Sequence, residues 1–178
     1  MILPKIEIKK ILYATDMSES ARQALAYAVS LAGLYHAGIT IVHALEESPG
    51  MEAAVMYHVG PERWAEIKRQ DEDNARNVII AKQREDSPAM KAALKEFYKE
   101  VSEKFENQSF QLDGVVVKRG NPVDVIVDTA NHTGCDLIVM GTHGIGGLAK
   151  MMLGSTAQKV LKNSKVPVLV VRLPTVAS

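Results

Sequence analysis

Glycines and hydroxyl-bearing residues gather between Asp136 and Val160, in the stretch DLIVMGTHGIGGLAKMMLGSTAQKV. Its glycines are Gly141, Gly144, Gly146, Gly147 and Gly154, and the last is followed by Ser155 and Thr156. Glycine lets backbone N–H groups approach a ligand closely, and a helix N-terminus adds unpaired N–H groups, so this pattern suits phosphate. Each glycine can also simply turn the chain, and Gly154-Ser155 can simply cap a helix. Five glycines in one stretch favour a phosphate-binding loop.

A strand and a helix must hold this loop. The apolar run Leu137–Met140 is too short for a helix, rich in β-branched residues and followed by Gly141, which predicts a buried strand. After Gly154, the residues Ala157, Val160 and Leu161 recur at helical spacing. The loop therefore leads from a strand into the positive end of a helix dipole.

Two standard phosphate motifs fit poorly. No glycine is followed by Lys-Ser or Lys-Thr, so there is no Walker A motif. Gly144, Gly146 and Ala149 match the dinucleotide fingerprint, but that motif belongs after the first strand and needs an acidic residue about 20 positions later. The chain has no Asp or Glu beyond Asp136. A dinucleotide oxidoreductase is therefore disfavoured, and a ribose-binding carboxylate must come from upstream.

The remaining elements alternate between strand and helix. Apolar runs predict strands at 11–14, 39–45, 110–118, 137–140 and 166–171. A helix follows the first strand and is expected to end at a C′ Gly38, and another runs from Asn121-Pro122 to Gly134. This alternation predicts an α/β fold, a doubly wound five-stranded parallel sheet with helices on both faces. Pro167 places the last strand at an edge, which predicts a homodimer through Val166–Val171.

The segment 46–108 between strands two and three is charged and mostly helical. We expect a loop up to Gly60, a helix from Pro61 to about Arg84, and a second helix from Ser87-Pro88. The second helix has an apolar stripe that indicates packing on the sheet: Met90, Ala93, Leu94, Phe97, Val101 and Phe105. No Gly/Ser-rich linker separates the segment, so we predict one domain over residues 1–178 with an extended helical insertion.

Composition excludes several classes of protein. The chain has 178 residues, 47% hydrophobic and 24% charged, as in a globular domain. Lys plus Arg and Asp plus Glu number 21 each, which does not indicate a nucleic-acid binder. The single cysteine, Cys135, fits a reducing compartment, and the sequence lacks a signal peptide and an 18-residue apolar stretch, so we expect a cytoplasmic protein without membrane contact. The histidines show no metal-ligand spacing, and His143 is expected to face solvent.

Ligands of open α/β sheets bind beyond the carboxyl ends of the strands. If strands one and four are neighbours, Thr15-Asp16 and Gly141–Gly144 face one crevice. Asp16 then either accepts hydrogen bonds from ribose hydroxyls or caps the next helix, and both roles remain open. Ser18 is the other candidate for this cap. His43-Ala44 ends strand two and would offer backbone groups to a flat base.

With these residues the chain resembles the ATP-binding subgroup of the universal stress protein family. The resemblance covers nearly the whole chain: Ile11–Asp16 with Ser18, His43, Gly120-x-Pro122, and Gly141 and Gly144 followed nine residues later by Gly154-Ser155. It implies strand order 3-2-1-4-5, a dimer through the last strands, and ATP with Mg²⁺ held mainly by phosphate oxygens. Ala14 departs from the proline that the family often has. The expected nucleotide-binding residues are Ala14, Thr15, Asp16, Ala44, Met140, Gly141, His143, Gly144, Gly154, Ser155 and Thr156.

The resemblance implies a regulatory nucleotide-binding module in the stress response, with slow or no hydrolysis. No Walker lysine and no carboxylate placed to activate water are evident, so we assign no catalytic residue and leave enzymatic activity open. One alternative is an ATP-using enzyme of related fold, either an ATPase or an adenylyl transferase. Another is an interaction protein with an empty cleft, in which segment 46–108 binds the partner.

Overall fold

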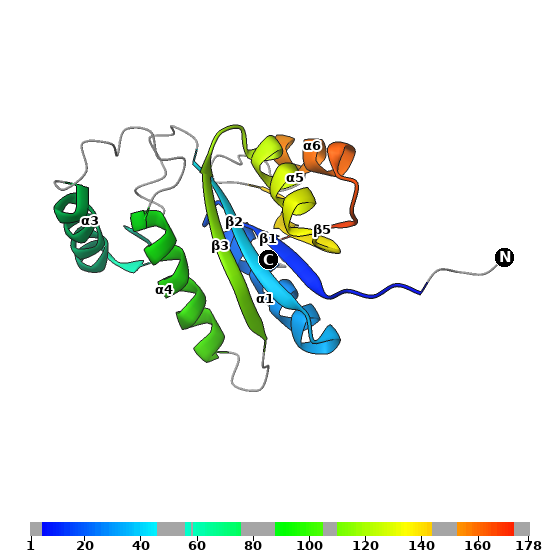
Figure 1. The fold of residues 1–178 in the computed structure, drawn as a ribbon, viewed down its shortest axis with the longest axis horizontal. Coiled ribbons are helices and arrows are strands. Elements are labelled where there is room, and N and C mark those ends of the chain that lie inside the picture. Colours follow the sequence, from blue (N-terminus) through cyan, green and yellow to red (C-terminus); the bar gives the residue numbers. More distant parts are fainter. Residues whose placement is uncertain are drawn as a thin grey trace, which may run out of the picture.

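The structure is a computed structural model that describes residues 5–45, 56–57, 59–75, 88–104, 110–143 and 153–172. Figure 1 shows the elements around a central sheet. In chain order they are β1 (Lys10–Ala14), α1 (Glu19–Tyr35), β2 (Gly38–Leu45), α3 (Pro61–Ala75), α4 (Pro88–Lys104), β3 (Gln111–Arg119), α5 (Pro122–Thr133), β4 (Leu137–Gly141), α6 (Ser155–Asn163) and β5 (Val168–Val171).

The sheet has five parallel strands in the order β3-β2-β1-β4-β5. This confirms the predicted doubly wound sheet and its strand order. The chain moves from β1 to β2 and β3 on one side and then crosses to β4 and β5 on the other. The order therefore reverses beside β1, which is where ligands bind in such sheets. The strand β5 is at an edge, as Pro167 predicted.

Two hydrophobic cores lie on the two faces of the sheet, because successive strand side chains point to opposite faces. Ile11 and Tyr13 of β1 belong to the core beneath α1 and α4. Leu12 and Ala14 belong to the core beneath α5 and α6. The helix α3 packs against α4, and Figure 1 shows it as the outermost helix.

The ends of two helices test the predicted boundaries. For α5 they are confirmed: Asn121 Oδ1 accepts from the Val123 N–H at 2.9 Å, and Gly134 ends the helix with φ of 61°. For α1 the predicted C′ glycine is wrong. The helix ends at Tyr35, and His36 takes the left-handed conformation with φ of 54°. Gly38 instead begins β2, where a Cβ would collide with the Asp113 carboxylate.

The insertion between β2 and β3 is helical where the structure describes it. The helix α3 begins at Pro61 as predicted, and its described part ends at Ala75. The predicted continuation to Arg84 and the predicted cap Ser87 lie outside the described residues. Four members of the predicted α4 stripe are buried, namely Met90, Ala93, Leu94 and Phe97, while the side chain of Val101 and all of Phe105 lie outside the described part. No helix within the described ranges is long and apolar enough to cross a membrane.

Candidate functional site

The expected site residues that the structure describes lie at the carboxyl ends of three adjacent strands and at the start of α6. In the sheet register, Ala14 of β1 lies opposite Val42 of β2 and Met140 of β4. Thr15 continues the pairing, because its N–H donates to the Val42 carbonyl at 3.0 Å. Ala44 lies further along β2, and Gly141 ends β4. Only Gly144 falls outside the described residues.

Polar side chains fix the turn between β1 and α1. Thr15 Oγ1 accepts from the Met17 N–H, and Asp16 Oδ1 accepts from the Ser18 N–H, both at 3.0 Å. Met17 has φ of 65°, an uncommon left-handed conformation for a residue with a side chain, and it is buried. Ser18 is the N-cap of α1, since its Oγ accepts from the Ala21 N–H at 3.2 Å. Asp16 therefore shapes the turn and is not the helix cap.

The start of α1 is joined to the residues that follow β4. Ser18 Oγ donates to the His143 carbonyl at 3.3 Å, and the His143 N–H donates to Ser20 Oγ at 3.4 Å. A Cβ on Gly141 would lie 2.8 Å from the Ser20 carbonyl carbon, closer than side chains tolerate. Gly141 is thus required by the close passage of α1, whatever it does for a ligand. Ser18 and Ser20 were missed as site residues. Ser18 was expected only as a candidate helix cap and as part of the family resemblance, and the only sequence signal for Ser20 is a hydroxyl at a helix start.

The N-terminus of α6 is held differently. Its N-cap is Gly154, and no side chain caps the first turn. The Gly154 N–H donates to the Thr142 carbonyl at 2.8 Å, and a Cβ on Gly154 would lie 2.8 Å from that same oxygen. Ser155 is exposed and Thr156 is half-buried. Because no capping side chain satisfies the first N–H groups of α6, this end can accept an anion.

His43 braces β2 against the β1–α1 turn. Its Nδ1 lies 2.7 Å from the Thr15 carbonyl oxygen, which can only accept, so Nδ1 carries the proton. The side chain is buried, and burial lowers the pKa of His43, while the Thr15 hydrogen bond and the nearby Asp16 charge act in the opposite direction. A neutral imidazole therefore holds the strand end next to Ala44.

His143 does not face solvent as predicted. The residue is half-buried, and its Nδ1 lies 3.0 Å from Oγ1 of the buried Thr142. Its Nε2 is buried and has no hydrogen-bond partner among the described residues. The backbone contacts with Ser18 and Ser20 pull this residue toward α1, which a loop pattern in the sequence does not reveal.

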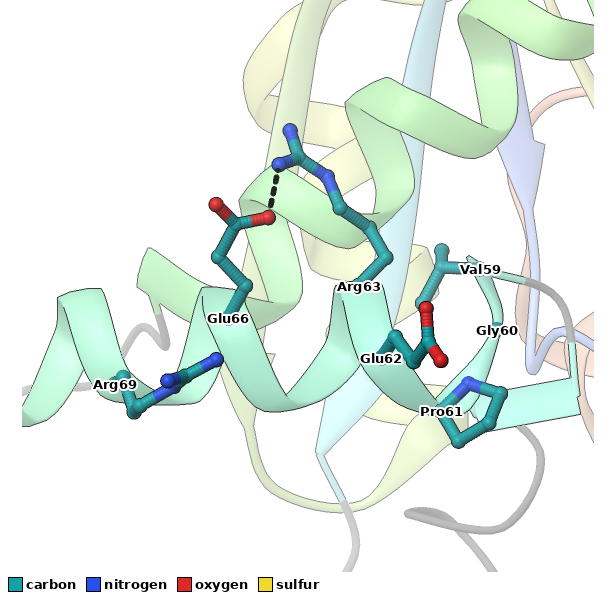
Figure 2. A pocket seen from close by; sticks show the side chains of 7 residues that line it. All are labelled: Val59, Gly60, Pro61, Glu62, Arg63, Glu66 and Arg69. Atoms are coloured by element: carbon teal, nitrogen blue, oxygen red, sulfur yellow. Dashed lines mark hydrogen bonds and ion pairs between the residues drawn. The ribbon is translucent and has the colours of Figure 1, made fainter.

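A separate hollow of about 660 Å³ lies along the start of α3, and Figure 2 shows its lining residues. They are Val59, Gly60, Pro61, Glu62, Arg63, Glu66 and Arg69. Arg63 is ion-paired with Glu66 at 2.7 Å, so its charge is already matched within the lining. None of the expected nucleotide-binding residues lines this hollow. In the described part of the chain, no group of three His, Cys, Asp or Glu residues could hold a metal ion.

Comparisons with known proteins identify the family of the chain. The sequence model of the universal stress protein family matches residues 7–172. Universal stress protein MJ0577 of Methanocaldococcus jannaschii is 29% identical over 170 residues, covering 92% of this chain and 94% of that protein. Universal stress protein YxiE of Bacillus subtilis is 32% identical over 164 residues, covering 92% of this chain and 98% of that protein.

Solved structures share the fold. The structure of MJ0577 matches with a TM-score of 0.62 at 29% identity, covering 96% of this chain and 99% of that one. A universal stress protein in complex with cAMP matches with a TM-score of 0.57 at 23% identity, covering 93% and 98%. The Archaeoglobus fulgidus protein in complex with dAMP matches with a TM-score of 0.50 at 20% identity, covering 94% and 100%. The family match extends over almost the whole chain and includes every expected site residue, so the chain belongs to the universal stress protein family.

Proposed function

We propose that this protein is an ATP-binding regulatory module of the stress response. The observation that carries the proposal is the N-terminus of α6, which has no side-chain cap and lies beside the residues that follow β4. A helix end of this kind stabilises the negative charge of phosphate. Two related proteins were solved with the adenine nucleotides cAMP and dAMP, which supports the same ligand class for this chain.

The described residues divide naturally among the parts of ATP. The phosphates would lie against Gly154, Ser155 and Thr156, together with Gly144. The ribose would lie against Asp16 and Gly141, and backbone groups of Ala44 would contact the base. The remaining lining would come from Ala14, Thr15, Met140 and His143. A bound Mg²⁺ would be held by phosphate oxygens, because the described residues provide no cluster of protein ligands.

Regulation fits this site better than rapid turnover. The chain has no Walker lysine, and Asp16, the expected ribose carboxylate, accepts a hydrogen bond from the Ser18 N–H. General-base activation of water needs a basic side chain within hydrogen-bond reach of that water, and the only carboxylate among the expected site residues, Asp16, is assigned to the ribose. We therefore propose slow or no intrinsic hydrolysis, within one cytoplasmic domain whose 46–108 insertion is available to a protein partner. The second half of the proposal is a homodimer through Val166–Val171, in which dimer state or conformation reports the nucleotide.

The test begins with protein purified without added nucleotide. The protein is denatured and filtered, and released small molecules are identified by mass spectrometry. We expect ATP or ADP at near one per chain. If nothing is released, calorimetry with Mg-ATP, ADP, AMP and GTP follows, and we expect ATP to bind more tightly than AMP because only ATP places further phosphates at α6. Equal affinity for ATP and AMP would contradict the phosphate assignment, and a flat titration would favour the interaction protein. Multiple turnover of ATP by the pure protein would favour the enzyme.

A further inference from the structure

The solvent side of α1 has an unusual composition. From Gln23 to Tyr35 the helix contains no Asp, Glu, Lys or Arg. Large apolar side chains instead reach solvent: Tyr27 is 53% exposed, Leu34 71% and Tyr35 46%, and Leu31 is half-buried between them. These four residues, which we call the α1 stripe, recur at spacings of three and four and so form one continuous surface. A continuous apolar surface of this kind marks an interaction site.

The direction of the stripe follows from two contacts. Ser20 faces β4, since its backbone closely approaches Gly141. Arg22 faces the other way, toward α4, with its guanidinium carbon 5.5 Å from the centre of the Phe97 ring. At 3.6 residues per turn, Tyr27 and Leu34 lie on the same side of the helix as Ser20. The stripe therefore faces away from α4 and toward the sheet edge formed by β5.

No strand among the described residues pairs with the outer side of that edge. The Ile138 N–H donates to the Pro167 carbonyl, and the Thr142 N–H donates to the Val171 carbonyl. Alternate residues of a strand bond to the same neighbour, so Val168 and Val170 direct their N–H and C=O groups outward. The strand has no charged residue, which leaves a short uncharged edge able to pair with another strand.

Pairing of two β5 strands fixes where the two copies of α1 lie. Antiparallel pairing about a two-fold axis perpendicular to the sheet keeps both α1 helices on the same face. The helix α1 packs chiefly over β4, which lies one and a half strand spacings from that axis. The two helices would then be about 14 Å apart. Directly packed helices lie only about 8–10 Å apart, so tyrosine and leucine side chains are the right size to fill this wider gap.

The area needed for a stable dimer also calls for more than β5. A stable interface buries about 800 Å² on each partner. The edge of a four-residue strand supplies only a small part of this. Half-exposed tyrosines and an exposed leucine add on the order of 100 Å² each. Building on the homodimer proposed above, we propose that the α1 stripe is the second half of its interface and contacts the same stripe of a second copy of this chain.

The experiment compares two sets of substitutions by sedimentation velocity between about 1 and 100 µM chain. Tyr27→Glu with Leu34→Glu places charges in the stripe. The matched control is Tyr57→Glu, because Tyr57 is 80% exposed and lies on the other side of α1, with Arg22 above its ring. We expect dimers for the wild type and the control. We expect the double variant to raise the dimer dissociation constant at least about 100-fold, because the two-fold axis brings two copies of each new negative charge into one interface.

Two further measurements separate the possible failures. Circular dichroism and Mg-ATP calorimetry on the double variant should match the wild type, because the stripe lies outside the nucleotide-binding residues. If the double variant does not fold, Tyr27→Ser should still raise the dimer dissociation constant about tenfold. A double variant that dimerises like the wild type overturns the role of the stripe and leaves the β5 dimer intact. A wild type that is monomeric at 100 µM overturns both dimer proposals, while ATP binding can still stand.

Discussion

The helices α1 and α6 begin at the same end of the sheet, yet their N-termini differ. The first turn of α1 is closed by Ser18, whose Oγ accepts from the Ala21 N–H. The first turn of α6 follows Gly154, which has no side chain to do this. Both helix starts are hydrogen-bonded to adjacent residues that follow β4: α1 through Ser20 to His143, and α6 through Gly154 to Thr142.

This difference separates a structural helix start from one that can bind a ligand. The N–H groups of a capped helix end are partly satisfied, whereas an uncapped end keeps donors and a positive dipole for an anion. The helix α5 follows the α1 pattern, because Asn121 caps it. Among α1, α5 and α6, whose N-caps the structure describes, only α6 lacks a capping side chain.

The largest effect is expected from a negative charge at the open end. Ser155→Asp puts a carboxylate in the first turn of α6, where it competes with phosphate. We expect Mg-ATP affinity to fall about 10- to 100-fold, or about 1.4–2.7 kcal/mol. The same carboxylate suits the helix dipole, so the free energy of unfolding should stay equal or rise by about 0.3–1 kcal/mol. Calorimetry measures the affinity for Mg-ATP, and urea unfolding measures the free energy of unfolding. We expect the affinity to fall while the stability does not.

Ser155→Asn is the control for that change, since it has the same shape without the charge. We expect it to bind Mg-ATP within about threefold of the wild type, a difference of well under 1 kcal/mol. Wild-type affinity in Ser155→Asp would show that the phosphates lie elsewhere and that the open end of α6 has another explanation.

A second prediction concerns the contact that joins α1 to β4. Gly141→Ala would place a Cβ 2.8 Å from the Ser20 carbonyl carbon, so α1 or β4 must shift. We expect a loss of about 1–3 kcal/mol in the free energy of unfolding, as for overpacked cores. Gly114→Ala in β3 is the control, because a Cβ there meets nothing within 4 Å. Equal stability of the two variants would mean that α1 and β4 can move apart to admit the Cβ without loss of free energy of unfolding.

A third, smaller effect distinguishes the caps themselves. Ser18→Ala removes the side chain that accepts from the Ala21 N–H, and it should cost about 1 kcal/mol. Ser155→Ala removes an exposed hydroxyl that is not an N-cap, so its unfolding should match the wild type in the same urea titration. A larger loss at Ser155 than at Ser18 would reverse the assignment of capped and open ends.

Local sequence signals were enough for most of the fold. Asn121-Pro122 and Gly134 delimit α5 because cap and turn preferences act within a few residues. The alternation of strands and helices restricts the sheet to few topologies, and parallel crossovers have a fixed hand. Pro167 indicated the edge strand because it has no N–H to donate.

The contacts that hold α1 and α6 against the residues after β4 could not be predicted, because they join residues far apart in the chain. Gly141 and Gly154 were interpreted as nucleotide-binding glycines, yet each also avoids a collision, Gly141 with Ser20 and Gly154 with the Thr142 carbonyl. No local pattern shows that Ser20 lies over Gly141. The left-handed His36 was likewise missed, since glycine is the residue that usually takes that conformation.

The smallest expected effect is a pH dependence of the free energy of unfolding. It comes from His43, which contacts the turn before α1. The usual pKa of histidine is about 6.5, and burial lowers the pKa of His43 below it. Between these two pKa values the folded protein keeps this side chain neutral, whereas the unfolded chain binds a proton. As pH falls below about 6.5, the unfolded state therefore takes up more protons, and the free energy of unfolding decreases until the pH passes the folded-state pKa. Above about pH 7 this contribution is constant.

His43→Gln should remove that part of the pH dependence, which urea unfolding at pH 5 to 8 would measure. His132→Gln is the control, because His132 lies exposed on α5 and its loss should leave the slope in place. His43 donates to the Thr15 carbonyl at the β1–α1 turn, so the variant also tests whether that turn depends on β2. An unchanged slope in His43→Gln would place the acid sensitivity elsewhere in the protein.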